Sequence, residues 1–450
     1  MKDNEKQRSD SFYSSEGEKG ETIDFRKFSP EKEKAHKPGV LKLLFKKNKV
    51  FDLSSDSDER PTVDLEAKKI SERFGIAHSI LWVVLIAFVV GYVTFFSDSI
   101  TTGSMQHVFR NMLGHGKIEE ALPSYGYSVN DNSVYAEFSG VPVIAGSDRV
   151  IIFAPDGSHQ YSDESPYTLP SIEASDEYIL IYDTLGSTFG IYDAFGIRYT
   201  ENEGGRIVDG AVSDNGTFAV ARKGNDYNSE ISVYASNFEL LNRIKKNNRV
   251  ASIDVRADGS EMMVISYYVY PDGSVESELM LLEVRSDAPR RLITINEGMP
   301  LECRYTSDGR IVILFDDMIS LLDRDGNEIT SMSIDVDGMF SYTLGENGEL
   351  LYLEGSYNDA KDFTAHLLRI EDVGVKKYQY DFRGRPTGLN MYGGKAYIIT
   401  GQTVIRLDTD GLQNAAYVDG SRHIYGITVV NGKEYVAYVD TLVACSFTEK

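Results

Sequence analysis

The chain has 450 residues, of which 42% are hydrophobic and 26% charged, a balance that suits a globular protein with a sizeable core. Residues 1–75 hold 17 basic and 16 acidic residues, so of the formal net charge of −23 the remainder carries −24, from 29 basic and 53 acidic residues. This acidic excess argues against binding to nucleic acid and against adhesion to anionic polymers, because both need a cationic surface.

The N-terminal segment, residues 1–75, is rich in Lys, Glu, Ser and Asp and holds few large apolar side chains. Because it cannot bury enough apolar surface, we expect a disordered tail. Within it, "KPGVLKLLFKKNKV" (37–50) can form a short basic amphipathic helix that lies on an anionic membrane surface. The alternative is a partly ordered tail in which these apolar residues have no common role.

The stretch "IAHSILWVVLIAFVVGYVTFF" (76–96) has 21 residues without a formal charge, which is long enough for a transmembrane helix. Three cations lie close before this stretch, whereas no cation follows it until Arg110. The positive-inside rule therefore predicts a single-pass protein of the cell membrane with a cytoplasmic N-terminus. We expect an extracytoplasmic stalk over 97–122 and an extracytoplasmic domain over 123–450. The alternative for 76–96 is a buried core helix.

The cysteines and glycosylation sequons bear on the compartment. Only Cys303 and Cys445 occur, and the single Asn-x-Ser/Thr sequon starts at Asn215 inside an expected tight turn. The exported part therefore cannot depend on a disulfide framework, and the pattern favours a bacterial envelope over a eukaryotic secretory route. We expect both thiols to be buried and unpaired.

A short hairpin phrase recurs along the second half of the chain, as in "AVSDNGTFAVARKG" (211–224) and "YTSDGRIVILFDD" (305–317). Asp-Gly and Asn-Gly favour two-residue type I′ hairpin turns, since both central positions need a positive φ. The flanking runs are short, β-branched and aromatic, as expected for strands. Units of roughly 35–50 residues with four strands each are typical of β-propeller blades.

The first turn of each unit marks the number of blades. These turns lie near residues 140, 176, 215, 258, 308, 347, 393 and 431, which predicts an all-β propeller of eight blades. The eighth unit lacks an outer strand, and "SYGYSVN" (124–130) can supply it and close the ring. Seven blades with a cap are the alternative.

The units resemble those of the WD40-like and quinoprotein-like β-propeller superfamilies, in period and turns over about residues 123–450. The layout is similar to uncharacterised membrane-anchored propeller proteins of Gram-positive bacteria. Gly-His and Trp-Asp pairs are absent from these units, and the single tryptophan, Trp82, lies in the expected span. We therefore expect no quinone and no other cofactor.

Motifs of catalysis are missing from the sequence. It contains no Gly-x-Ser-x-Gly elbow, no Gly-rich phosphate loop and no His-Glu-x-x-His zinc helix. Asp-x-Asp-Gly recurs, as at Asp323/Asp325, but without the further ligands of a calcium loop, so we interpret it as an acidic turn. We expect no metal site and no enzymatic activity.

Three loops between the second and third strands are longer than the others: 222–230, 267–277 and 354–365. Loops that outgrow a tight turn often carry function. We therefore predict that they bind an envelope protein, a peptide or a glycan, through Asn225, Asp226, Tyr227, Tyr267, Tyr268, Tyr270, Tyr357 and Asp359. The alternative is that they are long surface loops without a partner.

The sequence leaves three functions open. We favour a membrane-anchored extracytoplasmic propeller that acts as a binding or scaffold module in the cell envelope. The first alternative is an extracytoplasmic ligand sensor that signals to the cytoplasmic tail. The second alternative is a propeller enzyme that acts on glycans or peptides.

Overall fold

The computed structural model describes residues 78, 80–84, 86, 122–128, 132–154, 157–194, 196–202, 204–286, 288–295, 298–334, 339–355, 362–371, 374–408 and 414–449. The described residues between 78 and 86 are helical. Among the described residues no helix is both long and apolar enough to cross a membrane. The expected tail (1–75), most of the expected span (76–96) and nearly all of the expected stalk (97–122) lie outside the described residues.

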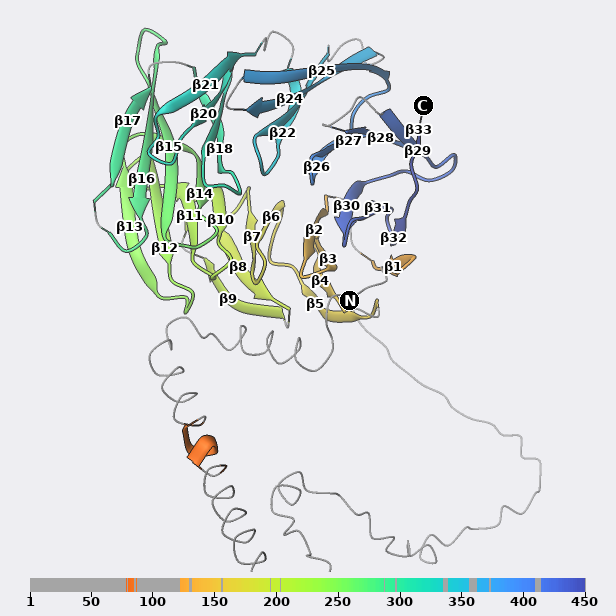
Figure 1. Ribbon diagram of the computed structural model, residues 1–450, viewed down its shortest axis with the longest axis horizontal. Coiled ribbons are helices and arrows are strands. Elements are labelled where there is room, and N and C mark those ends of the chain that lie inside the picture. The colour runs from red at the N-terminus through yellow and green to blue at the C-terminus, as the bar shows by residue number, and fades with distance from the viewer. Residues whose placement is uncertain are drawn as a thin grey trace, which may run out of the picture. The chain divides into compact units, whose positions relative to one another are not determined.

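Eight antiparallel sheets follow one another around a ring (Figure 1). Each sheet is a blade whose strands, called A to D from the centre outward, are hydrogen-bonded in that order. Blade 1 contains β2 (Val134–Phe138), β3 (Val141–Ala145), β4 (Arg149–Phe153) and β5 (His159–Glu164). Blade 2 contains β6 (Pro170–Ala174), β7 (Ile179–Asp183), β8 (Thr188–Asp193) and β9 (Gly196–Asn202). Blade 3 contains β10 (Ile207–Val212), β11 (Phe218–Lys223), β12 (Ser229–Tyr234) and β13 (Leu240–Lys246).

The other five blades repeat this order, with two additions at the end of the chain. Blade 4 contains β14 (Arg249–Val255), β15 (Glu261–Val269), β16 (Val275–Glu283) and β17 (Arg291–Ile295). Blade 5 contains β18 (Pro300–Tyr305), β19 (Ile311–Phe315), β20 (Met318–Leu322) and β21 (Glu328–Ser333). Blade 6 contains β22 (Met339–Leu344), β23 (Glu349–Glu354), β24 (Asp362–Glu371) and β25 (Gly374–Arg383). Blade 7 contains β26 (Gly388–Tyr392), β27 (Lys395–Thr400), β28 (Thr403–Asp408), β29 (Asn414–Val418) and a short fifth strand, β33 (Thr448–Glu449). Blade 8 contains β30 (Gly426–Val430), β31 (Lys433–Ala437), β32 (Thr441–Ala444) and β1 (Ser124–Gly126).

The N-terminal strand β1 closes the ring as the D strand of blade 8. It pairs antiparallel with β32, placing Tyr125 opposite Leu442. The Thr441 hydroxyl donates to the Tyr125 carbonyl at 3.1 Å, and the Ala444 amide donates to the Pro123 carbonyl at 2.9 Å. Both the eight-blade prediction and the closing role of the 124–130 stretch are confirmed. The fifth strand of blade 7, β33, was not expected from the sequence.

The core lies between blades, because the central strands bury both of their faces. In β19 the alternate residues Ile311 and Ile313 pack against blade 4, whereas Val312 and Leu314 pack against blade 6. Similar clusters join all other neighbouring blades. A strand with two buried faces needs an unbroken apolar run, which explains why these segments show no polar alternation.

The A–B turns of blades 2 to 6 are longer than the expected two-residue form, whereas those of blades 1, 7 and 8 have two residues, both with a positive φ. At Asp258, for example, only the following glycine, Gly259, has a positive φ, of 66°, and the loop is longer than two residues. The Asp258 carboxylate accepts a hydrogen bond from the Ser260 amide at 3.0 Å, which stabilises a type I turn followed by a left-handed glycine. The type I′ prediction was therefore wrong for the Asp-Gly turns that the structure describes in full and for Asn215–Gly216 and Asn347–Gly348. It is confirmed at Asn431–Gly432, where both residues have a positive φ.

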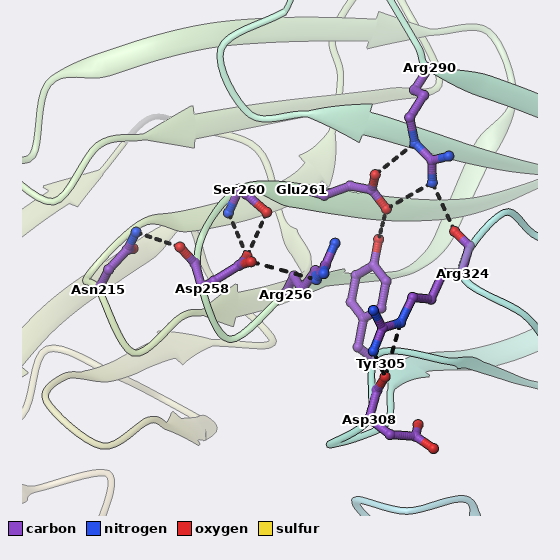
Figure 2. A network of polar contacts seen from close by, with 9 residues as sticks. All are labelled: Asn215, Arg256, Asp258, Ser260, Glu261, Arg290, Tyr305, Asp308 and Arg324. Atoms are coloured by element: carbon purple, nitrogen blue, oxygen red, sulfur yellow. Dashed lines mark hydrogen bonds and ion pairs between the residues drawn. The ribbon is translucent and has the colours of Figure 1, made fainter.

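The ring has two distinct faces. The A–B and C–D turns lie on one, the turn face, and the B–C and D–A loops lie on the other, the loop face. On the turn face, Figure 2 shows Glu261 accepting hydrogen bonds from Arg290 at 2.8 Å and from Tyr305 of the next blade at 3.0 Å. Arg290 also donates to the Arg324 carbonyl at 2.8 Å, so these polar contacts link blades 4 and 5.

Candidate functional site

The long B–C loops predicted to carry function lie on the loop face of blades 3, 4 and 6. The blade 3 loop spans 224–228, where Asn225, Asp226 and Tyr227 are exposed. In blade 4 the strands β15 and β16 continue further than expected, and the connection shrinks to 270–274. Most of the blade 6 loop lies outside the described residues.

The predicted tyrosines of blade 4 separate into two kinds. Tyr267 lies within β15 and is half-buried, opposite Arg249 of β14. Tyr268 and Tyr270 are 42% and 40% exposed, and their rings meet edge to face with centroids 4.9 Å apart. Tyr357 and Asp359, the predicted residues of the blade 6 loop, lie outside the described residues.

The exposed apolar side chains of the described propeller residues gather on the loop face. Each exposed apolar residue of this face lies in a B–C or D–A connection or at a strand end next to one. These residues are Leu169, Leu185, Tyr227, Tyr268, Val269, Tyr270, Val418, Tyr425 and Val439. Among the remaining ones, Leu240, Leu292 and Ile329 lie on outer strands. An apolar surface concentrated on one face is typical of a surface that a partner covers.

A second feature, which was not predicted from the sequence, is a central cavity of about 1540 Å³. The innermost strands line it, and it reaches the turns of the turn face. Carboxylates from four successive blades point to this cavity, namely Glu173, Asp209, Asp254 and Glu302, and Arg304 of β18 lies among them.

Hydrogen bonds hold two of these carboxylates in place. Asp209 accepts from the Ser252 hydroxyl at 2.8 Å, from the Ile253 amide at 2.9 Å and from the Tyr182 hydroxyl at 3.1 Å. Asp254 accepts from the Tyr305 amide at 2.6 Å. Both residues therefore join neighbouring blades as well as lining the cavity.

The cavity perturbs the ionisation of its acids. Desolvation raises the pKa of Glu173 to about 8, and Asp209 and Asp254 add to this, against the opposing effect of Arg304. Desolvation likewise raises the pKa of Asp254 to about 6. Although burial alone lowers the pKa of Arg304, the surrounding carboxylates outweigh it and the pKa is raised, so Arg304 stays charged. One guanidinium does not neutralise four carboxylates, so the cavity favours protons or cations.

A sequence signal for these acids exists, although it is weak. Each is the single acidic residue of its A strand, as in "IVDGAV" (207–212) and "RVASIDV" (249–255). Single acids in strands are usually surface residues, so the pattern indicates a shared cavity only once the ring places the A strands at its centre.

The described part of the chain contains no group of three His, Cys, Asp or Glu residues placed to hold a metal ion. Cys303 and Cys445 are both free and buried. Burial raises the pKa of the Cys445 thiol to about 12, which keeps it protonated.

Eight blades around a central channel define this protein as an eight-bladed β-propeller. The chain belongs to the family described as "Family of unknown function (DUF5711)", whose model matches residues 119–442. No curated protein matches the chain.

Several solved structures are similar to the chain. BamB from Moraxella catarrhalis is 12% identical with a TM-score of 0.36, over 61% of this chain and 95% of that one. A chain of the mitotic checkpoint complex is 11% identical with a TM-score of 0.42, over 73% and 91%. KlHsv2 with loop 6CD replaced by a Gly-Ser linker is 12% identical with a TM-score of 0.40, over 55% and 82%. These similarities are too low to inform function, and the strand order itself establishes the architecture.

Proposed function

We propose that this propeller is a binding module that docks a protein partner on its loop face. The observation that carries the proposal is the gathering of exposed apolar side chains on that face. Aliphatic side chains stand among them, such as Leu185 at 56% and Val269 at 46% exposure. Aliphatic groups beside tyrosines favour a protein surface over a glycan, which is bound mainly through aromatic rings and hydrogen bonds.

The proposal includes attachment to the cell membrane. It rests on the uncharged stretch 76–96 and on the cations that precede it, which favour a cytoplasmic N-terminus and an extracytoplasmic propeller. In this arrangement the loop face presents its tyrosines to other proteins of the cell envelope, and the propeller serves as a scaffold.

Photo-cross-linking in cells tests the docking face. A photoreactive amino acid replaces Val269 on the loop face of the full-length protein, or Leu292 on the outer strand β17, which is similarly exposed. We expect a discrete cross-linked protein, identified by mass spectrometry, from position 269 and none from position 292.

The tyrosines are tested in the same cells. A variant combining Tyr227→Ala, Tyr268→Ala and Tyr270→Ala should lose this product, because buried aromatic anchors often contribute about 2 kcal/mol each. Its melting temperature should stay near that of the wild type, since exposed substitutions usually change stability by about 0.5 kcal/mol or less. The matched control combines Leu240→Ala, Leu292→Ala and Ile329→Ala and should keep the product. A product that survives the tyrosine variant would contradict the proposal.

A further inference from the structure

A cluster of exposed cations lies on the loop face where blades 3 and 4 meet, and we call it the cationic corner. It consists of Arg206, Lys223, Lys245 and Arg249, all exposed. The segment "NRIKKNNR" (242–249) supplies half of it and contains four cations and no acid. Such a concentration stands out in a part of the chain whose net charge is −24.

The cations of the corner are not neutralised by ion pairs with the described residues. Lys223 and Arg249 make no ion pair with any residue that the structure describes, and the Lys245 ammonium lies 5.1 Å from the centre of the Tyr227 ring. Glu230, which lies opposite Lys245 in the register of β12 and β13, forms its ion pairs with Arg222 at 2.7 Å and with Arg243 at 3.3 Å.

Two further charged residues, Lys246 and Asp226, lie beside the corner. Lys246 pairs with Glu278 of the next blade. Asp226, in the 224–228 loop, is an exposed acid beside the corner. Among the described residues of the corner itself, four exposed cations stand against Asp226, while Asp272 and Glu276 lie further along the strip, in the blade 4 hairpin.

Hydrogen bonds make the corner continuous with apolar surface on both sides. Toward blade 2, the Arg206 guanidinium donates to the Thr184 carbonyl at 2.9 Å, and the Thr184 amide donates to the Leu169 carbonyl at 3.0 Å. Leu169 and Leu185 are exposed at this end. Toward blade 4, the Asn228 side chain donates to the Asn247 carbonyl, two residues before Arg249.

At the blade 4 end the strip reaches the exposed aromatic hairpin. Arg249 is the Cα partner of Tyr267, and Tyr268, Val269 and Tyr270 follow in the same strand and its turn. The loop face therefore carries aliphatic side chains at blade 2, cations beside them and aromatic side chains at blade 4.

We infer that the partner contacts this strip with an acidic segment that has apolar residues on both sides. The inference rests on the proposed function and names the chemistry of the partner. Carboxylates of the segment pair with Lys223, Lys245 and Arg249, while its apolar ends pack on Leu185 and on the Tyr268–Tyr270 pair. Charge complementarity of this kind sets the orientation of binding and speeds association at low salt.

Fluorescence anisotropy with defined probes tests the inference on the full-length protein. The probe is a fluorescein-labelled peptide with a run of glutamates between two leucine pairs, and its control carries lysines in place of the glutamates. We expect the acidic peptide to bind more tightly, and its affinity to fall as salt rises. A third probe, labelled polyphosphate, has charge but no apolar group.

The residues of the corner are tested by charge reversal. A variant combining Lys223→Glu, Lys245→Glu and Arg249→Glu should bind the acidic peptide at least about tenfold more weakly. The matched control combines Lys376→Glu, Lys377→Glu and Arg383→Glu on the outer strand β25, where all three cations are exposed, and should bind like the wild type.

Each other outcome overturns the inference. Equal binding of the two peptides, or unchanged binding by the corner variant, shows that the cations do not select an acidic segment. Polyphosphate that binds as tightly as the acidic peptide identifies the corner as a site for anionic polymers instead. The cross-link from position 269 separates the two proposals, because it persists when only the inference fails and is absent when the proposed function fails.

Discussion

Glu173 shows how a single side chain couples the ring to its environment. It stands in the central cavity with no ion pair among the described residues, so desolvation and neighbouring acids raise its pKa to about 8 from its ordinary value of 4.5. Between these values the folded protein keeps a proton that the unfolded chain releases. Folding stability therefore falls as the pH rises from about 4.5 to about 8.

Replacing Glu173 by glutamine removes this dependence. The variant Glu173→Gln should be more stable than the wild type at pH 8, by about 1–3 kcal/mol after allowance for coupling among the acids. At pH 4.5 and below the two proteins should differ little. Thermal denaturation of the full-length protein across this pH range provides the measurement. The control is Glu346→Gln, an exposed carboxylate at the rim of the same cavity. A less stable Glu173→Gln variant at pH 8 would show that the charged form is the favoured one.

The sequence predicted the local features of the site but not those that the ring assembles. Tyr227 and Tyr268 were found because their B–C connections are longer than tight turns, which is a local property. Glu173 and Asp254 were missed because they meet only after two distant A strands reach the centre of the ring. Tyr267 was expected in a loop, but β15 continues through it because Arg249 of β14 pairs opposite.

At the scale of elements, β1 matters more than its three residues suggest. Tyr125 is 1% exposed, and its ring packs edge to face against Phe153 of blade 1 at 5.2 Å and Tyr435 of blade 8 at 5.5 Å. This one side chain therefore joins the first and last blades. The strand β1 could be predicted because the eighth unit lacks an outer strand. The two-residue strand β33 is too short to show a strand pattern in the sequence.

Truncating Tyr125 tests the closing strand. The variant Tyr125→Ala should lower the free energy of unfolding by about 3–5 kcal/mol, because a large aromatic side chain leaves a cavity between two blades. Urea denaturation of the full-length protein measures the loss. The variant Tyr125→Phe keeps the ring packing and should stay within about 1 kcal/mol of the wild type. A change of similar small size for Tyr125→Ala would mean that the ring closes without this contact.

At the scale of the whole molecule, the proposed arrangement divides the chain at the 76–96 stretch. Protease added to intact, wall-stripped cells should digest an epitope tag placed at the C-terminus and spare a tag placed at the N-terminus. The reason is the excess of cations before the stretch, which retains that side in the cytoplasm. Both tags should be digested after the membrane is permeabilised. A protected C-terminal tag in intact cells would reverse the orientation.

The closing strand also dictates when the molecule becomes whole. The Thr441 hydroxyl and the Tyr125 carbonyl that it contacts are 316 residues apart in sequence. The strand β1, the first that the structure describes, must therefore wait with an unpaired edge until β32 has been synthesised. Contacts of such long sequence separation form slowly. A nascent chain halted before β32 cannot complete blade 8, so its ring stays open. The strand β1 then has no strand to pair with, and the apolar surface of blade 1 stays exposed for as long as the halt lasts.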